Sequence, residues 1–190
     1  MKKIISAIAV VLMISGLVCS SALAGGPKKI NKCMTITKSG SYVVNKNLKA
    51  TEKTEGDCII IDADFVTLDL NGFTLTGLDD GTGVGVWDNK RSHTGIVVRN
   101  GAITKFLIGI NLNHSQATTV ERILITKSHS YGMWVGGACI VTGNKVLYNS
   151  TGMIINCPAV IIGNTFKYNS VQNLNLITDS SECTVVNNAP

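Results

Sequence analysis

The chain has 190 residues, of which 45% are hydrophobic, 15% charged and only 5% aromatic, and its formal net charge is +5. This length suffices for one domain with a core of its own. Lys2 and Lys3 lie in an N-terminal segment that we expect to be removed. The remaining chain has 15 Lys and Arg and 12 Asp and Glu. Its net charge of +3 is too small and too scattered along the chain to suggest nucleic acid as a partner.

Residues 1–24 have the pattern of a secretory signal peptide. Lys2 and Lys3 precede an apolar run at 4–18, and Ala22-Leu23-Ala24 supplies a small-x-small cleavage site. The run is too short for a comfortable membrane span, and no later apolar stretch is long enough to cross a bilayer. The sequence therefore predicts cleavage near Ala24 and a secreted or periplasmic protein that does not span a membrane.

Five cysteines remain after this cleavage: Cys33, Cys58, Cys139, Cys157 and Cys183. Export permits disulfides, and no CxxC or other metal-site spacing occurs among them. Cys33 and Cys58 flank the first segment of the mature chain, so we expect them to pair. The odd number leaves at least one thiol free or paired between chains, and the pattern does not fix the pairing of the other three.

Residues 25–57 are expected to form an N-terminal cap. A short strand at 34–36 is followed by a turn at Ser39-Gly40 and a second strand at 42–44, and the lysine-rich piece 45–56 has the composition of a solvated loop. A cap here would cover the strand edges that the first of a series of stacked strands leaves open.

From Cys58 onward, apolar and polar residues alternate with the period of a strand. A glycine followed by alternating apolar residues recurs at Gly83, Gly109, Gly132 and Gly152, at intervals that shorten toward the C-terminus. The apolar members of these units are expected to point inward: 84 and 86, 110 and 112, 133 and 135, 153 and 155.

Two segments are near-copies of each other, GNKVLYNS at 143–150 and GNTFKYNS at 163–170. A fixed period of about 20 residues with strand alternation is typical of a stacked solenoid. We expect the repeated asparagines, Asn144 with Asn164 and Asn149 with Asn169, to hydrogen-bond from coil to coil. Tyr148 and Tyr168 leave two interpretations open: an outward stack would suit carbohydrate, whereas an inward pair, which we favour, would fill the core.

The runs CIIIDADFVTLDLNGFTLTG (58–77) and GIVVRNGAI (95–103), with the coils that follow, resemble the right-handed parallel β-helix repeat proteins of the pectate-lyase-like superfamily. The resemblance covers nearly all of the mature chain. It implies an all-β fold, a single-stranded right-handed parallel β-helix over 58–190 with about five to six coils and an N-terminal cap. It says less about function, because the superfamily includes lyases, glycoside hydrolases, surface-binding proteins and members without known activity.

Asp69, Arg99 and Glu121 are the candidate catalytic residues, because stacking of the Asn-Gly turns would place them on successive coils. They resemble the arrangement in pectate-type lyases, where carboxylates bind Ca²⁺ beside the uronate and an arginine acts as base. The competing interpretation is a ladder of surface ion pairs, each worth little. One carboxylate per coil falls short of the six or more oxygens that Ca²⁺ takes, so we assign no metal site, and Ca²⁺ belongs only to the lyase alternative.

Trp87, Asp88, Arg91 and Trp134 are the candidate ligand-binding residues. The first three lie in the glycine-rich segment 78–93, whose loops would project from a regular scaffold and so offer a place for binding, although most such segments are plain connectors. A tryptophan there could stack on a sugar ring.

Other polar residues suggest structural roles. Asp62 and Asp64, two residues apart, could flank a glycosidic bond or hold a metal, but such a pair is more often a capped turn. His93, His114 and His129 share no metal-ligand spacing.

Two functions remain open. A short solenoid without a complete catalytic set favours a non-catalytic protein that binds polysaccharide or another cell-surface component, or that has a structural role. The alternative is a small carbohydrate-active enzyme, a polysaccharide lyase or glycoside hydrolase. Ice binding is disfavoured because Thr-x-Thr occurs only at Thr35 and Thr74. An uncapped last coil, 173–190, would also permit end-to-end self-association.

Overall fold

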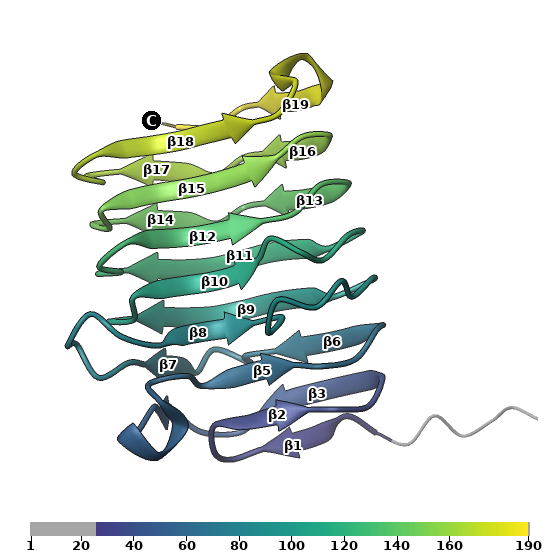
Figure 1. Cartoon of the computed structure of the whole chain (residues 1–190), viewed down its shortest axis with the longest axis vertical. Helices are drawn as coiled ribbons and strands as arrows, with labels where there is room; N and C mark the ends of the chain where they lie inside the picture. Colours follow the sequence, from purple (N-terminus) through teal and green to yellow (C-terminus); the bar gives the residue numbers. More distant parts are fainter. Residues whose placement is uncertain (1–25, 190) are drawn as a thin grey trace, which may run out of the picture.

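Figure 1 shows a computed structural model in which residues 26–189 are described. The predicted signal peptide, 1–24, lies outside the described residues. All paired strands run parallel, and each strand pairs with a strand one turn before it, one turn after it, or both, so the chain forms a β-solenoid. One turn, here called a coil, contributes one strand to a seven-stranded sheet and one or two strands to a twelve-stranded sheet.

The seven-stranded sheet contains one strand from each coil, in chain order. Its members are β2 (Met34–Ile36), β5 (Ile59–Ile61), β8 (Val84–Trp87), β10 (Ile108–Leu112), β12 (Tyr131–Val135), β15 (Thr151–Asn156) and β18 (Gln172–Ile177).

The twelve-stranded sheet bends at a corner, so that most coils cross it with two short strands or one long one. Its main path consists of β1 (Lys28–Ile30), β3 (Gly40–Val44), β6 (Val66–Asp69), β9 (Val97–Thr104), β11 (Thr119–Thr126), β13 (Cys139–Thr142), β16 (Ala159–Ile162) and β19 (Cys183–Val186). Beyond the corner lie β4 (Leu48–Lys49), β7 (Thr74–Thr76), β14 (Lys145–Leu147) and β17 (Thr165–Lys167). Two short 3₁₀ turns, η1 (Glu52–Thr54) and η2 (Ser180–Glu182), complete the described structure.

The core is a set of apolar columns that run along the solenoid axis. Because register is kept from coil to coil, Ile110 stacks on Met133, then Met153 and then Leu174. The eight positions that the alternation predicts to point inward are all buried. Each glycine that precedes them leaves room for the neighbouring coil: a Cβ on Gly109 would lie 2.5 Å from the carbonyl oxygen of Gly132. The repeated glycine therefore permits close stacking of the coils.

The predicted asparagine ladders are confirmed. Asn164 Oδ1 accepts hydrogen bonds from the backbone N–H of Asn144 at 2.9 Å and from its Nδ2 at 3.0 Å, and Asn188 repeats the pattern on Asn164. Asn149 and Asn169 form the second ladder, at 3.0 and 3.1 Å. Asn144, Asn149 and Asn164 are buried, so these side chains satisfy backbone groups that water cannot reach.

The solenoid has seven coils, more than the five to six that the sequence predicts. The difference arises at the N-terminus, in the segment 25–57 that the prediction assigns to a cap. Within it, β2, β3 and β4 form a complete coil whose strands pair with β5, β6 and β7, and β1 pairs with β3. The prediction counts only from Cys58 and so leaves this coil out.

Two disulfides join neighbouring coils. The predicted Cys33–Cys58 bond is confirmed, and Cys157 pairs with Cys183. In the described part of the chain, Cys139 is a buried free thiol. Disulfides of this kind are consistent with an extracellular location. Among residues 26–189, no helix has the length and apolar character that a membrane span requires.

Candidate functional site

The most distinctive surface is the corner at which the chain leaves the twelve-stranded sheet, directly after β9, β11, β14 and β17. Lys105, Lys127, Tyr148 and Tyr168 occupy equivalent positions there, one residue beyond strands that pair in register. All four have a left-handed backbone, with φ between 56° and 64°. The left-handed turn redirects the chain, and the four side chains are left on the outside of the solenoid. We call these four residues the corner column.

The two tyrosines of the corner column stack on each other and face solvent. Their ring centroids are 4.9 Å apart, their planes differ by 12°, and the residues are 57% and 65% exposed. The separation equals the spacing of adjacent strands, so the stack follows from the coil repeat. The favoured interpretation of an inward pair is therefore wrong: the asparagines that follow the tyrosines, Asn149 and Asn169, turn toward the interior instead.

The loop between β7 and β8 brings an acidic group over the same corner. Asp79, itself left-handed with φ 67°, accepts a hydrogen bond from Lys105 Nζ at 2.8 Å, and its Oδ1 lies 3.5 Å from His129 Nε2. The hydrogen bond from Lys105 lowers the pKa of the Asp79 carboxyl by more than partial desolvation raises it. Asp79 is thus ionised and ties the loop to two later coils.

A groove of about 410 Å³ lies between this loop and the stacked rings. Its lining combines aromatic surface, an ammonium, an imidazole, a carboxylate and hydroxyl groups, supplied by Tyr148, Tyr168, Lys127, His129, Asp79, Ser150 and Ser170, among others. Rings that offer apolar surface next to convergent donors and acceptors suit a ligand with both C–H and O–H groups.

The three candidate catalytic residues do come together as predicted. Asp69, Arg99 and Glu121 are in register on β6, β9 and β11. Arg99 Nε donates to Asp69 Oδ2 at 3.0 Å, while Glu121 pairs with Arg122. The arginine is thus held by one carboxylate, in an arrangement that matches the ion-pair ladder.

The oxygens of this face do not fit a calcium ion. Asp69 Oδ2 is engaged by Arg99 and by Asn100 Nδ2 at 3.1 Å, and Asp69 Oδ1 accepts from the backbone of Asn71. Across residues 26–189, no group of three or more His, Cys, Asp or Glu side chains is placed to hold a metal. The coordination number that Ca²⁺ requires is not offered by these neighbours.

The four candidate ligand-binding residues do not converge on one site. The carboxylate of Asp88 is 0% exposed and accepts hydrogen bonds from the backbone N–H groups of Lys90 and His114 and from Ser115 Oγ, each at 3.1 Å. Asp88 therefore fixes the turn of its own coil to the next one. Arg91 lies on the surface, with Nε 3.4 Å from Asp62.

Trp87 and Trp134 belong to one outward column of the seven-stranded sheet, separated by Asn111. Trp134 also contacts Tyr131 edge-on, with centroids 5.7 Å apart. The two indoles thus lie two coils apart, and neither lines the groove of the corner column.

Asp62 and Asp64 flank His93. Each carboxylate places an oxygen 3.4 Å from one ring nitrogen, and Asp64 also accepts from the backbone N–H of Thr94 at 2.9 Å. Asp64 therefore caps a backbone amide of the loop after β8, whereas Asp62 contacts only the side chains of Arg91 and His93.

Comparisons with known proteins return no match: no protein-family model, no curated protein and no solved structure is similar to the chain. The structure therefore shows a parallel β-solenoid, and the likeness to pectate-lyase-like proteins stays a resemblance of the sequence pattern.

Proposed function

We propose that this protein is an exported binding solenoid whose corner column holds polysaccharide. The observation that carries the proposal is the pair of stacked tyrosines, each more than half exposed, in a groove with Lys127 and His129. Contiguous exposed apolar surface on a protein often marks a binding site.

The geometry favours an extended ligand over a compact one. The corner column runs along the solenoid axis through four successive coils, so equivalent contacts recur at a fixed interval. A polymer with a repeating unit can use such a row, because each coil adds a similar weak contact. The hydroxyls of Ser150 and Ser170, one coil apart beside the rings, extend the same row.

The test is binding of the full protein to neutral and uronate-containing polysaccharides, measured by affinity electrophoresis and titration calorimetry. Tyr148→Ala and Tyr168→Ala should each weaken binding at least tenfold, about 1.4 kcal/mol, with the fold retained. The matched control is Phe65→Ala. Phe65 is an equally exposed aromatic with a left-handed backbone, φ 52°, but it lies on a different corner, where it packs over Gly95.

Wild-type protein that binds none of these polymers, or tyrosine variants that bind as well as the control, would refute the proposal. Release of unsaturated uronate products by the wild type and not by Arg99→Lys would instead establish the lyase alternative at the Asp69 face.

A further inference from the structure

The two ends of the solenoid differ in how the core is closed. At the N-terminal end Lys28 lies over the ring of Tyr42, with Nζ 5.1 Å from the centroid and 3.4 Å from the hydroxyl, and Ile30 and Ile36 are buried. At the other end the inward column finishes with Val185, which is 44% exposed, although Ile161 directly beneath it is 0% exposed. The apolar core is therefore covered at one end and open at the other.

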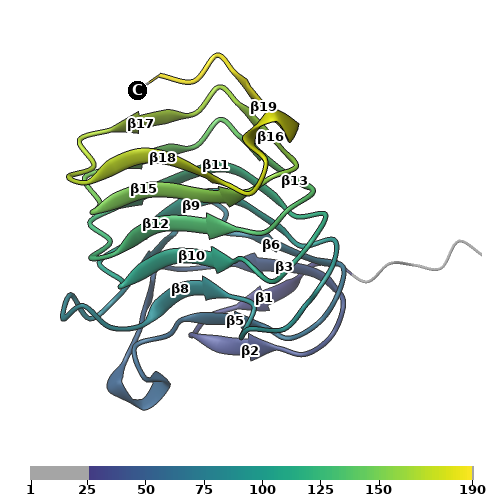
Figure 2. The ribbon, with the colours of Figure 1, turned by 45° about the horizontal axis from the view of Figure 1, so that its top comes forward.

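Within the described residues, the open end also presents unpaired backbone groups. Among the described residues, β18 pairs only with β15 and β19 only with β16, so both sheets finish in free strand edges, at the top of Figure 1 and in the upper part of Figure 2. Val171, in the turn that leads into β18, and Val186 on β19 add exposed apolar surface. Free edges beside exposed valines are a template for pairing with another chain.

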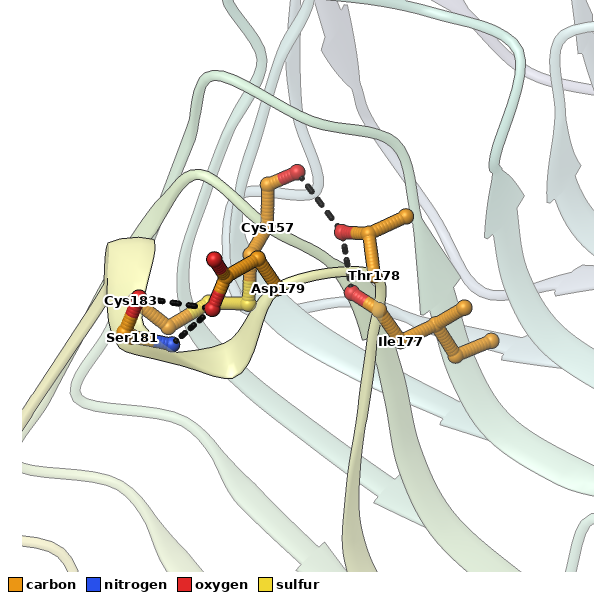
Figure 3. The surroundings of a disulfide bond; sticks show 6 residues. All are labelled: Cys157, Ile177, Thr178, Asp179, Ser181 and Cys183. Carbon is orange, nitrogen blue, oxygen red and sulfur yellow. Dashed lines mark hydrogen bonds between the residues drawn. A yellow bond between two sulfur atoms is a disulfide. The ribbon is translucent and has the colours of Figure 1, made fainter.

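The last coil is held in a defined position. The Cys157–Cys183 disulfide ties it to the coil beneath, and Thr178 Oγ1 donates to the carbonyl oxygen of Cys157 at 3.0 Å (Figure 3). Asp179 accepts from Ser181 and caps η2. The open end is therefore preorganised, which lowers the entropy lost when a partner binds.

Charge separates the two ends. Residues 26–57 contain seven lysines and three acidic residues, whereas residues 168–189 contain Asp179 and Glu182 and no Lys or Arg. Both acids belong to η2 and its cap, at the rim. The centre of the open end is thus apolar and uncharged, as the centre of a homodimer interface is.

We infer that two copies of this chain associate through their last coils, related by a two-fold axis, with the open end of each covering the other. A two-fold axis places the β18 and β19 edges of the copies antiparallel and buries Val185 of both, and the same surface serves each partner. The lysine-rich opposite ends point away from each other, and the assembly closes at two copies.

Head-to-tail stacking of the open end of one copy on the lysine-rich end of another is the competing arrangement. It is disfavoured because it would bury a charged group. Lys28 and Val185 are the two ends of one column, which runs through Tyr42, Val120 and Ile161. Stacking would press the Lys28 ammonium against Val185 and remove it from water. The desolvation of that charge outweighs the weak attraction between rim carboxylates and exposed lysines.

The test is the mass of the full protein by sedimentation equilibrium at low and high salt. We expect a monomer–dimer equilibrium that salt does not weaken. Val185→Lys should raise the dimer dissociation constant at least tenfold. Ile140→Lys is the control: Ile140 is 47% exposed, but on the outward face of β13 in the middle of the solenoid, so its replacement should leave the dimer intact.

Val185→Lys could disturb the fold of the last coil, so Val171→Glu repeats the test. Val171 is 74% exposed, so its replacement leaves the core unchanged and should also weaken the dimer. A wild-type protein that is monomeric up to about 1 mM, where even weak association is seen, would overturn the inference. So would a dimer that survives both end variants, or species larger than a dimer that dissociate as salt is added.

Discussion

At the scale of single residues, the buried asparagines replace the water that corner backbone groups would otherwise bind. Asn164 is central to one ladder, because its Oδ1 accepts from the backbone of Asn144 and its Nδ2 donates to the carbonyl oxygen of Val141 at 2.9 Å. Both partners are inside the solenoid, where an unpaired polar group costs about 1–3 kcal/mol.

Replacement of Asn164 by Ala should therefore lower the free energy of unfolding by about 3 kcal/mol, since it strands more than one buried group. Urea unfolding followed by circular dichroism measures this change. Asn175→Ala is the control, because Asn175 lies on the outward face of β18 and makes no side-chain hydrogen bond among the described residues. If both variants lose the same free energy of unfolding, the buried ladder stabilises the fold no more than the outward-facing Asn175 does.

The free thiol of Cys139 is protected by its surroundings. Desolvation by burial raises its pKa from 9.0 to about 11. The folded protein then keeps the thiol protonated where the unfolded chain ionises it, so this group destabilises the fold progressively between about pH 9 and pH 11 and has no effect below that range.

Alkylation at pH 8 should consequently leave Cys139 unmodified in the native protein and modify it within minutes in denaturant. Mass spectrometry of the labelled peptide provides the readout, and the four disulfide-bonded cysteines serve as the internal control. Rapid native labelling would contradict the burial of this side chain.

At the scale of one element, the last coil has a neighbour on one side only within the described chain. Its strands β18 and β19 pair with β15 and β16, and the Cys157–Cys183 bond closes a loop with a sequence separation of 26 residues. Closure of a loop of that size stabilises a fold by about 3 kcal/mol, through the unfolded chain.

Conversion of Cys157 and Cys183 to Ala should therefore cost about 3 kcal/mol and should speed amide hydrogen exchange in β18 and β19 far more than in β12. In a solenoid each coil contacts only its neighbours, so the loosening stays local. Removal of the Cys33–Cys58 bond is the matched control and should loosen β2 and β5 instead. Identical exchange profiles for the two variants would contradict this local behaviour.

At the scale of the whole molecule, the sequence predicts the fold because each column arises from a short local pattern repeated along the chain. Alternation on every strand and a repeat of nearly constant length suffice to stack parallel coils. The first coil lies in the segment 25–57, which the prediction assigns to a cap and does not count, and this is why the sequence predicts too few coils.

The sequence pattern does not predict the orientation of the tyrosines, because strand alternation does not continue through a left-handed corner. Val146 points inward, and a period of two would send Tyr148 inward as well. The left-handed residue shifts that phase by one, so Tyr148 faces out and Asn149 faces in. Residues 105, 127, 148 and 168 share one position, because each follows a strand by one residue. Two of them are lysines and two are tyrosines, so the sequence does not show that the positions are equivalent. The placement of Asp79 over this corner depends on a loop without any repeat.

The equivalence of the fifth and sixth coils has a consequence for how such a molecule changes over generations. Asn144, Tyr148 and Asn149 match Asn164, Tyr168 and Asn169 at a constant offset, and every column continues through both coils. Duplication or loss of the codons for one such coil would keep all columns in phase. Each event would lengthen or shorten the rod by one strand spacing, about 4.8 Å, and add or remove one ring. The number of coils alone can therefore set the length of the corner column.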